Sequence, residues 1–121
     1  MTLPSVVILL ARCARQQDRT FGIRLEERTA DSWYATWAFA LPESMAAREG
    51  YDRTETRGSF QLDEAEYPGC AHCRNPGFVL CARCDRLGCW SPTEPIYRCP
   101  WCSASGPVGG EITRLRAGGD L

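Results

Sequence analysis

The sequence predicts a small, mainly-β fold with a minor helical part, in which an antiparallel sheet with one short helix is followed by a cysteine-rich subdomain. Three observations lead to this prediction. Apolar and polar residues alternate through much of the first half, which is typical of strands with one buried face. A single short segment has the signals of a helix. Seven of the eight cysteines lie between residues 67 and 106.

Composition and charge narrow the class of protein. The 121 residues are 44% hydrophobic and 24% charged, which is typical of a small globular protein. The formal net charge is −1, whereas a non-specific nucleic-acid binder normally carries clear positive charge. Composition changes near residue 67, so we expect a sheet subdomain over 1–66, a cysteine-rich subdomain over 67–106 and a C-terminal strand or tail over 107–121.

The first 66 residues contain three segments with strand character before a helix. Residues 5–15 begin with an apolar, β-branched run, and residues 20–26 and 33–41 alternate with period two. We expect the apolar faces of the last two segments to form the core. These faces hold Phe21, Ile23 and Leu25 in one segment, and Trp33, Ala35, Trp37, Phe39 and Leu41 in the other.

A short helix and a fourth strand complete this part. Residues 42–49 have proline and glutamate in their first turn and are followed by Gly50, a common helix terminator. Residues 57–62 alternate again, with Phe60 and Leu62 expected to face inward.

No targeting segment is evident. The apolar run 6–11 covers six residues, whereas a membrane helix needs about 20. It also lacks the basic region and the cleavage site of a signal peptide. We therefore expect a cytoplasmic protein that does not bind membranes.

The cysteine spacing indicates a metal site. From residue 70 the pattern is C-x2-C-x7-C-x2-C-x4-C-x9-C-x2-C. Two intervening residues form a tight turn that brings both thiolates to one ion, and zinc prefers four such ligands in a tetrahedron. Iron is an alternative metal, because sulfur ligands also accept it. Disulfides are the alternative to a metal site, but they would need an oxidising compartment. We expect one or two zinc ions, held by Cys70, Cys73, Cys81, Cys84, Cys89, Cys99 and Cys102.

Two groupings of these cysteines remain open. The second pair (Cys81, Cys84) and the third pair (Cys99, Cys102) can form a zinc ribbon with strands over 87–90 and 96–98, which leaves the first pair and Cys89 as a trio. Alternatively, the first and second pairs share one ion and the other three cysteines form the trio. Cys13 or His72 can complete a trio, and the alternative for Cys13 is a buried thiol.

A series of short motifs matches one known family. Tyr-Pro-Gly-Cys-x2-Cys-Arg-Asn at 67–75 is followed by Phe-Val-x-Cys-x2-Cys at 78–84, Cys-Trp at 89–90 and Cys-Pro-Trp-Cys at 99–102. Upstream are Phe-Gly-Ile-Arg at 21–24, Trp-Ala-Phe at 37–39 and Arg-Glu-Gly-Tyr at 48–51. Over residues 13–105 this series resembles the TerY C-terminal metal-binding domain, a zinc-ribbon family.

The resemblance implies a zinc-binding accessory module. In that family the domain typically follows a von Willebrand factor A domain, in tellurite-resistance and stress or phage-defence gene neighbourhoods that often include a kinase and a phosphatase. The sequence lacks the Asp-x-Ser-x-Ser motif of that companion domain, so adhesion-type magnesium binding does not carry over. We expect protein–protein interaction with a partner in trans, such as a von Willebrand A protein, a kinase or a phosphatase.

No catalytic constellation is present in the sequence. A Gly-rich phosphate loop is absent, and the single histidine leaves little scope for a nucleophile–base pair. We therefore expect an adaptor and not an enzyme. The alternative is a nucleic-acid-binding zinc ribbon, which the net charge disfavours. Its candidate surface is an arginine and aromatic patch of Arg74, Arg83, Arg86, Arg98, Trp90 and Trp101.

Overall fold

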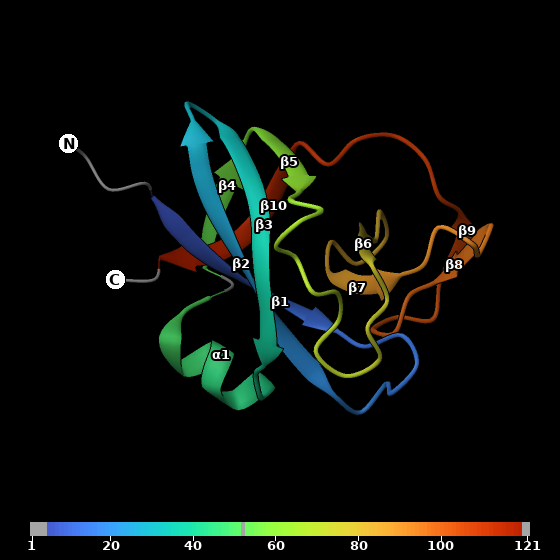
Figure 1. The fold of residues 1–121 in the computed structure, drawn as a ribbon. Coiled ribbons are helices and arrows are strands. Elements are labelled where there is room, and N and C mark those ends of the chain that lie inside the picture. Colours follow the sequence, from blue (N-terminus) through green and yellow to red (C-terminus); the bar gives the residue numbers. More distant parts are fainter. Residues whose placement is uncertain (1–4, 52, 120–121) are drawn as a thin grey trace.

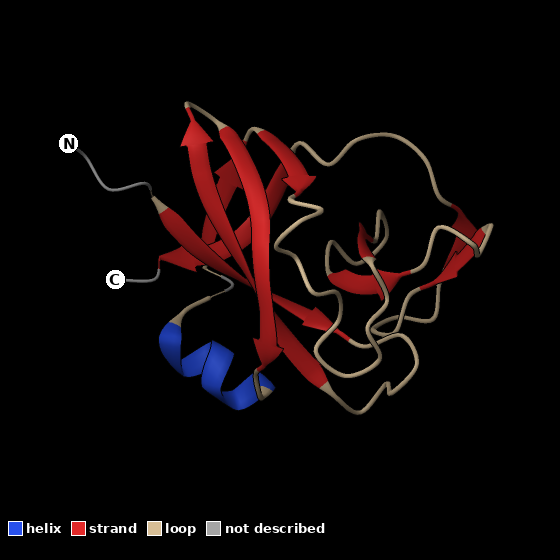
Figure 2. Cartoon of the chain, viewed as in Figure 1, coloured by secondary structure: helices blue, strands red, loops and turns tan. Residues whose placement is uncertain are grey.

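The computed structural model describes residues 5–51 and 53–119 and shows a mainly-β fold (Figures 1 and 2). Residues 1–4 and 52 of the expected first subdomain, and residues 120–121 of the expected tail, lie outside the described residues. The elements are β1 (Val6–Arg12), β2 (Thr20–Thr29), β3 (Ser32–Ala40), α1 (Glu43–Glu49), β4 (Thr54–Arg57), β5 (Ser59–Leu62), β6 (Gly77–Leu80), β7 (Leu87–Trp90), β8 (Ile96–Arg98), β9 (Ser105–Pro107) and β10 (Arg114–Gly119).

Strand β1 is the branch point of the main sheet. One edge of β1 pairs with β2 along its whole length. Two strands share the other edge of β1. The first residues of β1 pair antiparallel with β10, and its last residues pair in parallel with β7. The sheet order is β4-β10-β1-β2-β3-β5, with β7 and then β6 added at β1, and β8 and β9 form a separate pair. The sheet therefore crosses the expected boundary at residue 67, since β6, β7 and β10 belong to it.

The core lies against one face of this sheet. Phe21, Ile23 and Leu25 are fully buried there, as their alternation in β2 predicts. Three cysteines, Cys13, Cys70 and Cys89, are buried in the same cluster. The sheet and part of the cysteine-rich segment therefore share one core.

The expected face of β3 is interrupted by a β-bulge. Trp33 is 7% exposed and faces the core, whereas Trp37 is 54% exposed. The cause is a register shift, because Leu25 pairs with Ala35 while its neighbour Arg24 pairs with Trp37. One extra residue reverses the alternation. The prediction that Trp37 belongs to the core is therefore wrong.

Beyond the bulge, Phe39 and Leu41 pack into a second, smaller cluster and not into the core of Trp33 as expected, whereas Ala38 lies in the main core. Leu41, Ile8 and Ala46 of α1 are buried there, with Phe39 partly buried against them. The helix ends at Gly50, which has a left-handed φ of 75°. Among the described residues, no helix has the length and hydrophobicity that a membrane span requires.

The strand expected over 57–62 is divided by Gly58. This glycine has φ 141°, a conformation that other residues rarely adopt, and its N–H donates to the carbonyl of Thr113. The residues before it pair with β10 as β4, whereas those after it pair in parallel with β3 as β5. Phe60 and Leu62 are partly buried against the core, on the inward side that their alternation indicates.

The bulge predicts unequal effects of two tryptophan substitutions. Trp33→Ala should lower the free energy of unfolding by about 3–5 kcal/mol, because it removes a large buried side chain. Trp37→Ala should change it by about 0.5 kcal/mol or less, since that ring is largely in solvent. Urea denaturation of both variants measures this difference, and equal losses would contradict the bulged register.

Candidate metal centres

The structure gathers the eight cysteines into two groups of four. Within each group the sulfur atoms all lie within 4.8 Å of one another. None of the eight is in a disulfide. The inner group comprises Cys13, Cys70, Cys73 and Cys89, and the outer group comprises Cys81, Cys84, Cys99 and Cys102.

The three Cys-x2-Cys pairs share one backbone conformation. In the first pair the N–H of Cys70 donates to the carbonyl of Asn75, at 3.0 Å, and the N–H of Arg74 donates back to the carbonyl of Cys70, at 2.9 Å. The same two bonds recur at the equivalent positions of the other pairs. The residue after each second cysteine is left-handed, with φ of 66° at Arg74, 62° at Asp85 and 66° at Ser103. Each pair is thus a knuckle that turns the chain back on itself.

These knuckles determine how the nearby strands pair. The second knuckle joins β6 to β7 and the third joins β8 to β9, each as an antiparallel hairpin. The zinc ribbon expected from the sequence instead used the strands over 87–90 and 96–98. In the structure these two strands, β7 and β8, do not pair with each other. The outer group still combines the second and third pairs, as in the first of the two groupings.

The inner group is completed by Cys13. This residue directly follows β1, and Cys89 lies in β7. The parallel register pairs Ala11 with Leu87 and Arg12 with Gly88, so the next position on each strand is a cysteine. The first knuckle then contributes its two thiols from the loop before β6. Cys13 was one of the two candidates for completing the trio, and the structure places it there.

His72, the other candidate, lies outside the sulfur group. Its ring Nε2 lies 2.7 Å from the carbonyl of Thr20, to which it donates. The ring also meets Phe21 edge-on, with centroids 6.4 Å apart. The backbone N–H of His72 donates to the sulfur of Cys70, at 3.4 Å. The side chain therefore holds the first knuckle against β2.

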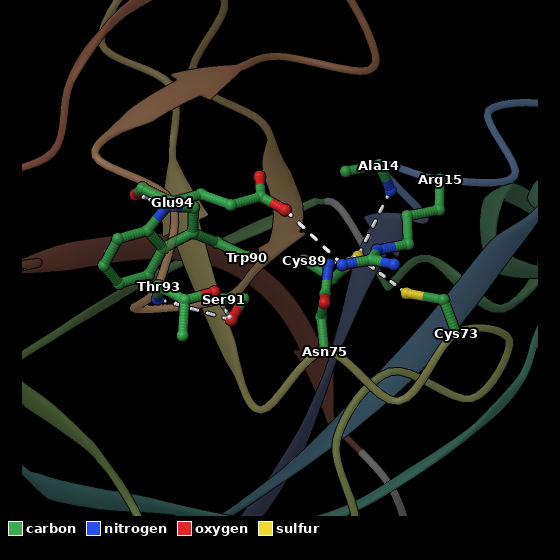
Figure 3. Close-up of polar contacts among 9 residues, drawn as sticks. All are labelled: Ala14, Arg15, Cys73, Asn75, Cys89, Trp90, Ser91, Thr93 and Glu94. Carbon is green, nitrogen blue, oxygen red and sulfur yellow. Dashed lines mark hydrogen bonds and ion pairs between the residues drawn. The ribbon is translucent and has the colours of Figure 1, made fainter.

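Several N–H groups point at the sulfur atoms of the inner group. The Sγ of Cys89 accepts from the N–H of Ala14, at 3.2 Å, and from the side-chain amide of the buried Asn75, at 3.4 Å (Figure 3). The Sγ of Cys13 accepts from the N–H of Gln16, at 3.2 Å. Such donors stabilise thiolates, because they offset negative charge that burial would otherwise penalise. Asn75 is a thiolate partner that the sequence does not single out, since its only signal there is its place just after the first knuckle.

The sulfur separations fit a tetrahedral metal. The sulfurs of Cys73 and Cys89 are 3.5 Å apart, and the pairs Cys81–Cys102 and Cys84–Cys99 are 3.7 Å and 3.6 Å apart. Four sulfurs at about 2.3 Å from a tetrahedral zinc would be about 3.8 Å apart. A disulfide requires about 2.05 Å. Each group therefore has the ligand number, element and spacing of a four-thiolate metal site.

The thiols differ in how readily they ionise. A hydrogen bond with the Cys89 thiol lowers the pKa of Cys70 to about 5. Burial opposes this shift, whereas hydrogen bonds from the amides of His72 and Cys73 add to it. In the outer group burial raises the pKa of Cys81, but hydrogen bonds from the amides of Cys84 and Arg83 outweigh it and bring the pKa to about 7. Burial raises the pKa of Cys13 to about 11. Ionising all four thiols of a group therefore requires a cation, whose binding releases protons.

The two groups differ in their surroundings. In the inner group only Cys73 is partly exposed and the other three cysteines are buried within the main core, whereas Cys84 and Cys102 of the outer group are both partly exposed. The outer group packs against a separate small cluster around Tyr97. Trp101 attaches it to the sheet, because its indole N–H donates to the carbonyl of Leu87, at 2.7 Å.

Part of the expected arginine and aromatic patch is present around Trp101. The guanidinium of Arg86 lies 4.5 Å from the ring centroid. That of Arg12, at the end of β1, lies 4.1 Å from it. Trp90, by contrast, donates its indole N–H to the carbonyl of Glu94, at 3.0 Å. The contacts of Trp101 are internal ones that join the third knuckle to β1 and β7.

Substitution of Cys13 tests the composition of the inner group. Cys13→Ser should remove one of two bound metal ions, as Cys89→Ser should, because each leaves three thiolates. A buried thiol with no ligand role would leave the metal content unchanged. Metal analysis of the purified variants, with native mass spectrometry, distinguishes the two results.

The difference in burial predicts two stages of metal loss. A chelator should remove the metal of the outer group first, since two of its cysteines are accessible, and leave the main sheet folded. Loss of the second metal should unfold the core, because structural zinc sites supply about 10–16 kcal/mol of apparent folding free energy. Colorimetric release kinetics, followed alongside circular dichroism, measure both stages. Release of both ions in one step would contradict this order.

No protein-family model, no curated protein and no solved structure matches the chain. What the chain does must therefore be inferred from its own residues, above all from the two four-cysteine groups.

Proposed function

We propose that this chain is a non-catalytic zinc-binding accessory module that mediates a protein–protein interaction. The observation that carries the proposal is the pair of complete four-cysteine groups, each with its sulfurs within 4.8 Å of one another. Such a closed set of thiolates is typical of structural zinc, whereas a catalytic zinc keeps a position open for water or substrate. The metals then fix the shape of the protein and leave its surface to bind a partner.

Zinc is the metal that fits best. Thiolate sets of this kind accept zinc or iron. With one zinc ion bound, each group of four thiolates would carry a net charge of about −2. The N–H donors to Cys13 and Cys89 offset this charge in the buried group. Zinc also brings no redox chemistry that would disturb a core.

The resemblance of the motifs to the TerY C-terminal domain supports the class of partner. By that resemblance, the module acts in a tellurite-resistance, stress or phage-defence type of system. Its partner in trans is then a von Willebrand A protein, a kinase or a phosphatase. The absence of a nucleophile–base pair in the sequence supports an adaptor role.

The proposal predicts the metal content and the binding class of the purified protein. Elemental analysis should find two zinc ions per chain, and iron in their place would contradict the metal assignment. Gel shifts at low salt, with single-stranded and duplex DNA, should show no complex, because the chain carries a net charge of −1 before metal is added. A DNA complex that dissociates as salt rises would contradict the adaptor role and favour the nucleic-acid alternative.

A further inference from the structure

Strands β5 and β6 border one groove, and each has an unpaired edge. β5 pairs with β3 and β6 pairs with β7, and in the described residues neither strand has a second neighbour. Two adjoining cavities, of about 660 Å³ and 450 Å³, lie between them. Both cavities are lined by Phe60, Gln61, Phe78 and Ile112. Residues 108–113, in the chain that connects β9 to β10 (Figure 1), line the larger cavity.

The backbone of β5 directs free hydrogen-bonding groups into this groove. The N–H groups of Ser59 and Asp63 donate to the carbonyls of Asp31 and Ala35, on the β3 side. Alternate residues of a strand point their N–H and C=O groups to opposite sides. The main-chain groups of Phe60 and Leu62 therefore face the unpaired edge.

The backbone of β6 does the same from the other side. The N–H of Cys81 donates to the carbonyl of Arg86, which makes this a hydrogen-bonded pair of the hairpin with β7. The pairing alternates along an antiparallel ladder, so Val79 and Gly77 also bond to β7. The N–H and C=O groups of Phe78 and Leu80 consequently face the groove.

Apolar side chains form the floor of the groove, whereas its rim is polar and carries more acidic than basic side chains. Phe60, Phe78 and Ile112 are partly buried along its floor. Glu64 lines the smaller cavity and Glu111 lines the larger one, so the two glutamates lie in different parts of the groove. Asp85 and Arg114 also line the larger cavity, but they form ion pairs with Arg116 and Glu55. Both glutamates are exposed, and neither forms an ion pair within the described part of the chain.

We propose that the groove between β5 and β6 binds an extended segment of the protein partner by strand addition. The free edges supply main-chain hydrogen bonds, and the apolar floor accepts every second side chain of the segment. The acidic rim favours Lys or Arg at both ends of the segment. This inference rests on the proposed function, since it specifies where an adaptor would hold its partner.

Selection of peptides on the protein loaded with two zinc ions tests the proposal. A displayed library of random twelve-residue peptides should yield sequences with alternating apolar residues, basic ends and no central proline. The best peptide is then synthesised, and amide hydrogen exchange is measured with and without it. Exchange should slow at Phe60, Leu62, Phe78 and Leu80. Failure to select any peptide, or slowing at other strands only, would overturn the proposal.

Charge reversal at the rim gives a second measurement. Glu64→Lys combined with Glu111→Lys should weaken binding of the selected peptide about tenfold at low salt, and less at high salt. Glu49→Lys, at an exposed position of α1 away from the groove, should leave the affinity unchanged. Both variants should retain two zinc ions, because none of these side chains belongs to either cysteine group. Equal affinities for all the variants would contradict the acidic rim.

The outcomes separate this inference from the proposed function. If the protein holds two zinc ions and its partner complex survives the double charge reversal, the groove is not the site, although the adaptor role stands. If the chain lacks zinc or binds DNA, the proposed function fails. Amide exchange at the groove could also slow in the absence of peptide as the protein concentration rises. In that case the occupant is a second copy of this chain, which would also overturn the proposal.

Discussion

The parallel pairing of β1 with β7 holds the two halves of the chain together and so positions both the core and the inner cysteine group. Ala11 pairs with Leu87 and Arg12 pairs with Gly88, so the next residues along the two segments are Cys13 and Cys89. These two cysteines come from opposite halves of the chain. This brings the end of the first strand into the cysteine-rich segment, and the first knuckle completes a group of four thiols. Because Cys13, Cys70 and Cys89 are also buried in the main core, a metal bound there would fix the sheet and the knuckle loop together.

The two four-cysteine groups join different parts of the structure. The inner group joins elements that are distant in the sequence, so metal binding there closes long loops whose ordering is otherwise entropically costly. The outer group joins the tips of two adjacent hairpins, β6–β7 and β8–β9, and Trp101 attaches it to the carbonyl of Leu87. One metal would therefore hold the domain and the other would hold a projecting element. The groove between β5 and β6 lies where two edges of the main sheet have no neighbouring strand among the described residues.

Local patterns in the sequence were enough to predict much of this structure. The alternation of Phe21, Ile23 and Leu25 identified a buried face, and the three Cys-x2-Cys spacings identified the knuckles, because both depend on neighbouring residues. The bulge that exposes Trp37 was not predictable in this way, since it arises from pairing with β2. The choice of Cys13 as the fourth inner cysteine likewise depends on a long-range strand contact. Spacing alone left Cys13 and His72 as alternatives, and the contact with Thr20 accounts for the histidine.

Both metals should be held by four thiolates, with Cys13 as the fourth ligand of the inner one. X-ray absorption at the zinc edge of the protein loaded with two zinc ions measures this most directly, because it reports the elements and distances of the ligands. We expect four sulfur neighbours per zinc at about 2.3 Å and no nitrogen or oxygen in the first coordination sphere. A nitrogen or oxygen ligand at about 2.0–2.1 Å, from His72 or water, would contradict it.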